Sequence, residues 1–170
     1  MNDTTGPTLP GTIRAAAADD VEQIRMLALD NAMFEPDEME GFDEQLQGYL
    51  DGALEGHQWL VATGPAGEVE GAAFYAPEPF GDRVWNLYFL AVRPSRQGRG
   101  VGASIIRHVE QSLTAAGEDA ARVLIVETSS QNAYAGARRF YTREGFDTEA
   151  VIREFYGPDD HKFVFWKSLV

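Results

Sequence analysis

Hydrophobic and polar residues follow one another along the chain in runs that predict seven strands and four helices. Apolar or alternating runs between turn residues predict strands, and apolar residues spaced three and four apart predict helices. The predicted strands cover residues 12–16, 59–63, 69–77, 84–92, 122–128, 147–156 and 161–169. The predicted helices cover residues 21–33, 42–54, 101–113 and 135–143. The order βααβββαβαββ indicates an α/β fold of the α+β type, with helices packed on a mixed sheet.

Two strands lie in the interior of that predicted sheet. Val84–Val92 and Arg122–Thr128 are apolar on both faces, which is typical of central strands. Turn residues separate the other strands, and no internal repeat or low-complexity segment interrupts the pattern. We therefore expect a single domain over residues 12–170, preceded by a polar, flexible tail at residues 1–11.

Composition excludes several classes of function. The 170 residues contain no cysteine, so neither a disulfide nor a cysteine nucleophile is available. Three scattered histidines make a metal site an unfavourable hypothesis, and we expect none. No apolar run approaches the roughly 20 residues that a membrane-spanning helix needs. The beginning of the chain lacks a basic-then-apolar signal pattern, so we expect a cytoplasmic protein.

The charge of the chain is strongly uneven. The net charge is −13, and residues 1–90 carry 17 acids and 3 bases. This excess of acids argues against nucleic-acid and anionic-membrane partners. Residues 91–113, in contrast, hold four arginines and one acid, and they surround the glycine-rich run RQGRGVG at Arg96–Gly102.

The glycine-rich run indicates an anion site. Glycine permits positive φ and close approach of a ligand to the backbone, and the predicted helix from residue 101 offers unpaired N–H groups and a positive dipole end. Together these favour a phosphate group. The Gly-Lys-Ser/Thr of an ATP-binding P-loop is absent. Gly98-x-Gly100-x-x-Ala103 fits a dinucleotide fingerprint in part, although Glu127 lies 29 residues past Gly98 rather than about 20.

A second pattern in the same run is Gln-x-x-Gly-x-Gly, from Gln97 to Gly102. The stretch LAVRPSRQGRGVGASIIRHVEQSL resembles the signature motif of the GNAT superfamily of acyl-CoA N-acyltransferases. The later runs VLIVETSS, RRFYTREGF and GPDDHKFVFWKSL resemble the strands and the helix that follow in that family. The similarity covers roughly residues 12–169 and implies a GNAT-like domain whose central strands splay apart.

The resemblance also implies a binding site for acetyl-CoA. In the family, backbone N–H groups of the glycine loop hold the pyrophosphate of coenzyme A, and Arg96 and Arg99 can add positive charge. The strand before the loop carries a bulge, and its backbone holds the pantetheine arm and polarises the acetyl carbonyl. An asparagine seven residues before the catalytic tyrosine contacts coenzyme A in many relatives; Tyr134 stands at that position here, which leaves Asn132 as the candidate. The implied cofactor-binding residues are Leu90, Ala91, Val92, Gln97, Gly98, Arg99, Gly100, Val101, Gly102 and Asn132.

Two side chains are implied as catalytic. Tyr141 corresponds to the general acid that protonates the departing thiolate, since a tyrosine with a pKa of about 10 can give and recover a proton. Glu127, at the end of a buried strand, could accept a proton from the amine or bind a cationic substrate. Packing among aromatic residues is the structural alternative for Tyr141, and capping of the next segment is that for Glu127.

The expected function is transfer of an acetyl group from acetyl-CoA to a primary amine by direct attack through a tetrahedral intermediate. The alternatives are a non-catalytic coenzyme A-binding regulatory module and an NAD-dependent oxidoreductase. The expected acceptor is a small-molecule or peptide amine. The six acids within Phe34–Glu44 favour a polycationic acceptor, although a solvated loop would look the same. Exposed edge strands often pair, so a homodimer is a further expectation.

Overall fold

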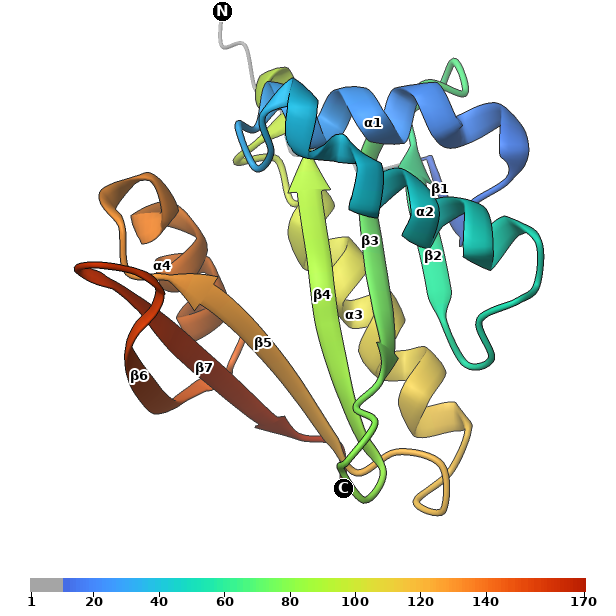
Figure 1. Ribbon diagram of the computed structural model, residues 1–170. Helices are drawn as coiled ribbons and strands as arrows, with labels where there is room; N and C mark the ends of the chain where they lie inside the picture. The colour runs from blue at the N-terminus through green and yellow to red at the C-terminus, as the bar shows by residue number, and fades with distance from the viewer. Residues whose placement is uncertain (1–10) are drawn as a thin grey trace, which may run out of the picture. The chain divides into compact units, whose positions relative to one another are not determined.

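The computed structural model describes residues 11–170, and its strands form one seven-stranded mixed sheet in the order β1-β2-β3-β4-β5-β7-β6 (Figure 1). The strands are β1 (Thr12–Ala15), β2 (Gln58–Thr63), β3 (Val69–Pro77), β4 (Val84–Val92), β5 (Val123–Ser129), β6 (Asp147–Gly157) and β7 (Asp160–Ser168). The helices are α1 (Val21–Asp30), α2 (Met39–Leu50), α3 (Val101–Ala115) and α4 (Ala135–Arg143). The predicted fold class and element order are confirmed. Most of the expected N-terminal tail, residues 1–10, lies outside the described residues.

The second helix begins earlier than the sequence pattern predicted. α2 spans Met39–Leu50 instead of residues 42–54, and a 3-10 turn at Pro36–Glu38 leads into it. The Glu38 carboxylate accepts the backbone N–H of Glu35 at 2.9 Å, which closes this turn one residue before the helix. Gly52, with φ +70°, ends the helical path shortly after Leu50. Most of the acid-rich segment Phe34–Glu44 is therefore ordered 3-10 and α-helix rather than a loop.

The chain divides into two compact units, of which the first contains residues 11–75 and Phe89–His108. In this unit α1 and α2 lie on one face of the strands and α3 on the other (Figure 1). Trp59 on β2 is 1% exposed and stacks on Phe74 with ring centroids 5.0 Å apart, and Phe42 from α2 meets its edge at 5.4 Å. Burial of each such aromatic side chain contributes about 2–3 kcal/mol to folding. This aromatic core seats α2 on the sheet.

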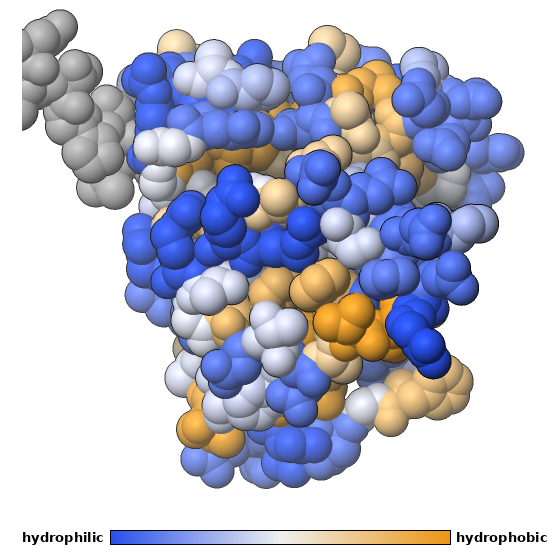
Figure 2. All heavy atoms as spheres, turned by 90° about the vertical axis from the view of Figure 1, so that its left-hand side faces the viewer, coloured by the Kyte–Doolittle hydropathy of each residue, from blue (hydrophilic) through white to orange (hydrophobic). Residues whose placement is uncertain are grey.

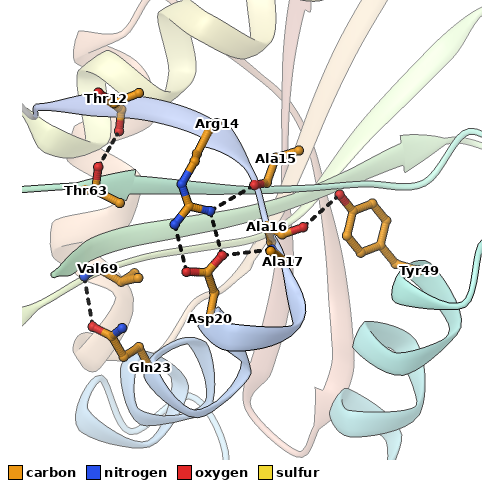
Figure 3. A network of polar contacts seen from close by, with 10 residues as sticks. All are labelled: Thr12, Arg14, Ala15, Ala16, Ala17, Asp20, Gln23, Tyr49, Thr63 and Val69. Atoms are coloured by element: carbon orange, nitrogen blue, oxygen red, sulfur yellow. Dashed lines mark hydrogen bonds and ion pairs between the residues drawn. The ribbon is translucent and has the colours of Figure 1, made fainter. Parts of the chain in front are cut away.

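Polar contacts join β1 to the helices of the first unit (Figure 3). Asp20 accepts two hydrogen bonds from the Arg14 guanidinium, at 2.7 and 2.9 Å, and a third from the Ala17 N–H at 2.8 Å. The Arg14 hydrogen bonds are the largest cause that lowers the pKa of Asp20. Tyr49 of α2 donates to the Ala16 carbonyl at 3.3 Å. These bonds fix where α1 begins relative to β1.

The second unit contains Ala76–Tyr88 and Val109–Val170. Here α4 packs on the sheet through Tyr141, whose ring lies 5.6 Å from Phe165 of β7 and 5.8 Å from Phe146. β6 is the terminal strand, and its apolar side chains Val151, Ile152, Phe155 and Tyr156 are about half exposed. Figure 2 views the side on which β6 lies in Figure 1 and shows apolar surface among polar side chains.

The two central strands pair over a short distance. β4 and β5 run parallel, and their register covers four residues of each strand, from Val84–Val123 to Leu87–Val126. Tyr88 on β4 and Glu127 on β5 are the first residues after this ladder. The parallel ladder that joins the two central strands therefore ends at Leu87 and Val126.

Candidate functional site

The glycine loop has the backbone geometry that an anion site requires. Gly98 and Gly100 have φ of +73° and +86°, which is the region that side-chain-bearing residues avoid. A Cβ atom added to either glycine would meet no atom within 4 Å, so open space lies beside both. α3 begins at Val101, directly after the loop, and its first N–H groups have no partner within the helix. An anion placed there would receive hydrogen bonds and the favourable end of the helix dipole.

Side-chain amides hold the beginning of this loop in place. The Gln97 Nε2 donates to Asn31 Oδ1 at 2.8 Å and to the Val92 carbonyl at 3.2 Å. Asn31, just after α1, donates in turn to the Val92 carbonyl at 3.1 Å and to the Leu27 carbonyl at 2.8 Å. The three segments α1, β4 and the loop are therefore tied at one point. Sequence reasoning missed Asn31, because its only local signal is that of an ordinary helix C-terminus.

The two arginines expected beside the loop have different environments. Arg96 forms an ion pair with Glu70 at 2.8 Å and a longer one with Glu68 at 3.5 Å, and the Glu70 side chain is only 6% exposed. A buried carboxylate requires such a cation, so the charge of Arg96 is already compensated within the protein. Arg99 is exposed and forms no ion pair within residues 11–170. Of the two, Arg99 has the charge that a phosphate group can use.

The end of β4, just before the glycine loop, contains the three residues that are expected to contact pantetheine. Ala91 is 4% exposed, while Leu90 and Val92 are partly exposed. The Val92 carbonyl is engaged by Asn31 and Gln97, so it is not available to accept a hydrogen bond from a ligand without losing these contacts. The roles expected of Leu90, Ala91 and Val92 toward pantetheine stay predictions.

Tyr141 lies in α4 and is 8% exposed. Rings of Phe140, Phe146 and Phe165 surround it, and within the described residues its hydroxyl has no hydrogen-bond partner. Burial raises the pKa of the Tyr141 hydroxyl well above its ordinary value of about 10. The phenol therefore keeps its proton throughout the neutral range, which is the form that a general acid needs.

Glu127 is joined to a lysine that sequence reasoning did not anticipate. Lys162 of β7 places its Nζ 3.1 Å from Glu127 Oε1, and the same ammonium lies 3.6 Å from the ring centroid of Phe155. The Lys162 side chain is only 10% exposed, so carboxylate and aromatic face together stabilise its buried charge. The pairing of β5 with β7 brings the two side chains together, and their separation by 35 positions in sequence hides this.

Asn132 is exposed at the beginning of the 3-10 turn Asn132–Tyr134, and its side chain has no hydrogen-bond partner within residues 11–170. Its expected contact with coenzyme A stays a prediction. Among the described residues, no group of three or more histidine, aspartate or glutamate side chains could hold a metal ion. No helix in the same part of the chain has the length and apolar character to cross a membrane.

Comparison with known proteins agrees with this geometry. The sequence model of the acetyltransferase (GNAT) domain matches residues 55–148. A solved structure from Desulfovibrio desulfuricans, assigned to the GNAT acetyltransferases, is 30% identical and superposes with a TM-score of 0.84, covering 94% of this chain and 99% of that chain. Among curated proteins, none matches.

Two more distant structures share the fold and contain the cofactor. The acetyltransferase yncA from Salmonella typhimurium, solved with acetyl-CoA, is 21% identical with a TM-score of 0.75, and the match covers 94% of each chain. An aminoglycoside 6'-N-acetyltransferase complexed with coenzyme A is 14% identical with a TM-score of 0.72, over 94% of this chain and 97% of that chain. With the family model covering more than half of the sequence, this chain belongs to the GNAT family of acetyltransferases.

Proposed function

We propose that this protein transfers the acetyl group of acetyl-CoA to a primary amine. The observation that carries the proposal is the glycine loop, where Gly98 and Gly100 adopt positive φ beside open space at the first turn of α3. This geometry fits a diphosphate, and membership of the GNAT family supports coenzyme A as the molecule that carries it. The backbone N–H groups from Gly98 to Gly102, together with the Arg99 side chain, would hold it.

The chemistry assigned to this chain is a direct transfer. The amine nitrogen forms a bond to the acetyl carbon, the carbon–sulfur bond breaks, the amine loses a proton, and the leaving thiolate gains one. Tyr141 is the proposed proton donor to the thiolate. Glu127 is the proposed acceptor-side carboxylate, and its ion pair with Lys162 fixes the position of its Oε1 atom.

A screen of amines with purified protein and acetyl-CoA tests this proposal, with free thiol release as the measurement. Amine-dependent thiol release together with a new amide in the product supports acetyl transfer. Binding of acetyl-CoA without turnover on any amine would leave a coenzyme A-binding regulatory module. Stabilisation by NAD instead of acetyl-CoA would contradict the proposal, although the largely antiparallel sheet already differs from the parallel sheet of dinucleotide-binding folds.

Asn31 provides a test of the loop without touching any residue assigned to catalysis. Asn31→Ala removes the bond that holds Gln97, so acetyl-CoA must order the loop on binding and its KM should rise about tenfold. The value of kcat at saturating acetyl-CoA should stay within about twofold. Steady-state kinetics measure both, and Gln47→Ala on the exposed face of α2 is the control. An unchanged acetyl-CoA KM in Asn31→Ala would show that the loop needs no such anchor.

A further inference from the structure

The second unit contains a carboxylate, Glu78, that no cation among residues 11–170 neutralises. Glu78 lies between Pro77 and Pro79, and its backbone is held by bonds from its N–H to the Val84 carbonyl at 2.8 Å and from the Gly81 N–H to its own carbonyl at 3.1 Å. Its side chain is partly buried. Within residues 11–170 it takes part in no ion pair.

Both protein contacts of this carboxylate reach the same oxygen atom. Tyr88 Oη donates to Glu78 Oε2 at 3.0 Å, and Asn86 Nδ2 donates to that same oxygen at 3.3 Å. Glu78 Oε1 has no partner in the described part of the chain. The contacts therefore orient the carboxylate and leave half of its acceptor capacity unused.

Asn86 adds an independent sign of a missing ligand. The residue is 2% exposed, and its Oδ1 is a buried oxygen without a hydrogen-bond partner. Exchanging the amide oxygen and nitrogen would not solve this, because the oxygen would then face the Glu78 carboxylate. Buried polar atoms without partners are rare in native proteins. The unused Oε1 atom of the charged Glu78 favours a cationic group with several N–H donors, and the buried Oδ1 of Asn86 is a second acceptor without a partner on the neighbouring side chain.

Glu127 is less suited than Glu78 to bind a cationic ligand. The charge of Glu127 is balanced by Lys162, whereas Glu78 has no such partner in the described part of the chain. Glu127 is nevertheless close enough that its charge acts on Tyr88, whose hydroxyl Glu78 holds. Burial, the hydrogen bond to Glu78 and these two charges raise the pKa of Tyr88 to about 12, so Tyr88 remains a donor to Glu78 at neutral pH.

The protonation state of the acceptor amine assigns different roles to Glu78 and Glu127. An amine must be neutral when it attacks the thioester, so the reacting nitrogen carries no charge that Glu78 could bind. The cation bound by Glu78 must then be a second group of the same acceptor. Resting on the proposed function, we infer that Glu78, Asn86 and Tyr88 form a subsite for a second ammonium group, and that the acceptor is a diamine or a larger polyamine.

The experiment compares an unbranched diamine with a monoamine of the same chain length in wild type and in Glu78→Gln. This substitution keeps the shape of the side chain and removes its charge. Wild type should prefer the diamine by at least about tenfold in kcat/KM, and Glu78→Gln should lose this preference through the diamine KM, as expected for a charged hydrogen bond. The KM for acetyl-CoA and the kinetics with the monoamine should change less than about twofold. Glu149→Gln, an exposed carboxylate on β6 of the same unit, is the control.

A second readout does not depend on turnover. The dissociation constant of the diamine, measured by calorimetry without acetyl-CoA, should rise about tenfold in Glu78→Gln. Unaltered diamine affinity and preference in Glu78→Gln would overturn the subsite, even if acetyl transfer itself is observed. Loss of the preference in a variant with Glu35, Asp37 and Glu40 neutralised, but not in Glu78→Gln, would place recognition in the acid-rich segment instead. Diamine binding at Glu78 without acetyl transfer to any amine would support the subsite and contradict the proposed function.

Discussion

Tyr141→Phe should lower kcat about 100-fold while the KM for acetyl-CoA changes less than about twofold. General acid catalysis contributes about 10²–10⁴-fold, and this substitution removes the hydroxyl while the ring keeps its contacts with Phe146 and Phe165. The hydroxyl has no hydrogen-bond partner in the described chain, so its loss leaves no unsatisfied group and the melting temperature should not fall. Steady-state kinetics and thermal melting measure both parts. Tyr49→Phe, which removes a hydroxyl from the first unit, is the control for kcat.

The same residue predicts the alkaline limb of the pH profile. Burial raises the pKa of Tyr141, so its protonated, acid-competent form persists beyond the ordinary tyrosine pKa of about 10. We therefore expect no loss of kcat through deprotonation of Tyr141 between pH 8 and pH 10. An undiminished kcat in Tyr141→Phe would assign Tyr141 to packing alone, and solvent would then have to protonate the thiolate.

Gly100→Val should abolish acetyl-CoA binding at concentrations that saturate the wild type. Gly100 has φ +86°, which a β-branched residue adopts only with strain, and the added side chain would enter the open space beside the loop. A ligand at 100 times its dissociation constant stabilises a protein by about 2.7 kcal/mol, which raises the melting temperature by several degrees. That increase should be absent in Gly100→Val.

Gly67 provides a matched control for backbone strain. It lies in the turn between β2 and β3, has φ +85°, and likewise has no atom within 4 Å of an added Cβ. Gly67→Val should therefore lower the melting temperature of the free protein by a similar amount and retain the increase with acetyl-CoA. An equal response of both variants to acetyl-CoA would contradict the assignment of the glycine loop.

Local patterns determined most of the fold. The apolar spacing of Val101, Ile105, Ile106, Val109 and Leu113 predicted the buried face of α3, and all five side chains are at most 4% exposed. The bounds of β3, β4 and α4 coincide with the predicted runs. Such features depend on neighbours within one turn or one strand, which the sequence displays directly. α2 is the exception, since Pro36 and the Glu38 side chain start a turn inside a stretch whose acids suggested a loop.

In the candidate site too, local motifs predicted some features and tertiary contacts decided others. Its glycine loop, Tyr141 and Glu127 lie in recognisable local motifs, so the sequence by itself determined the family and the expected cofactor. The state of these groups depends on distant partners: Glu70 binds Arg96, Asn31 holds Gln97, and Lys162 neutralises Glu127. Charge compensation depends on distances of a few ångströms between strands, which no spacing along the chain reports. For this reason only the tertiary structure decided that Arg96 and Glu127 form ion pairs, whereas Arg99 and Glu78 form none within residues 11–170.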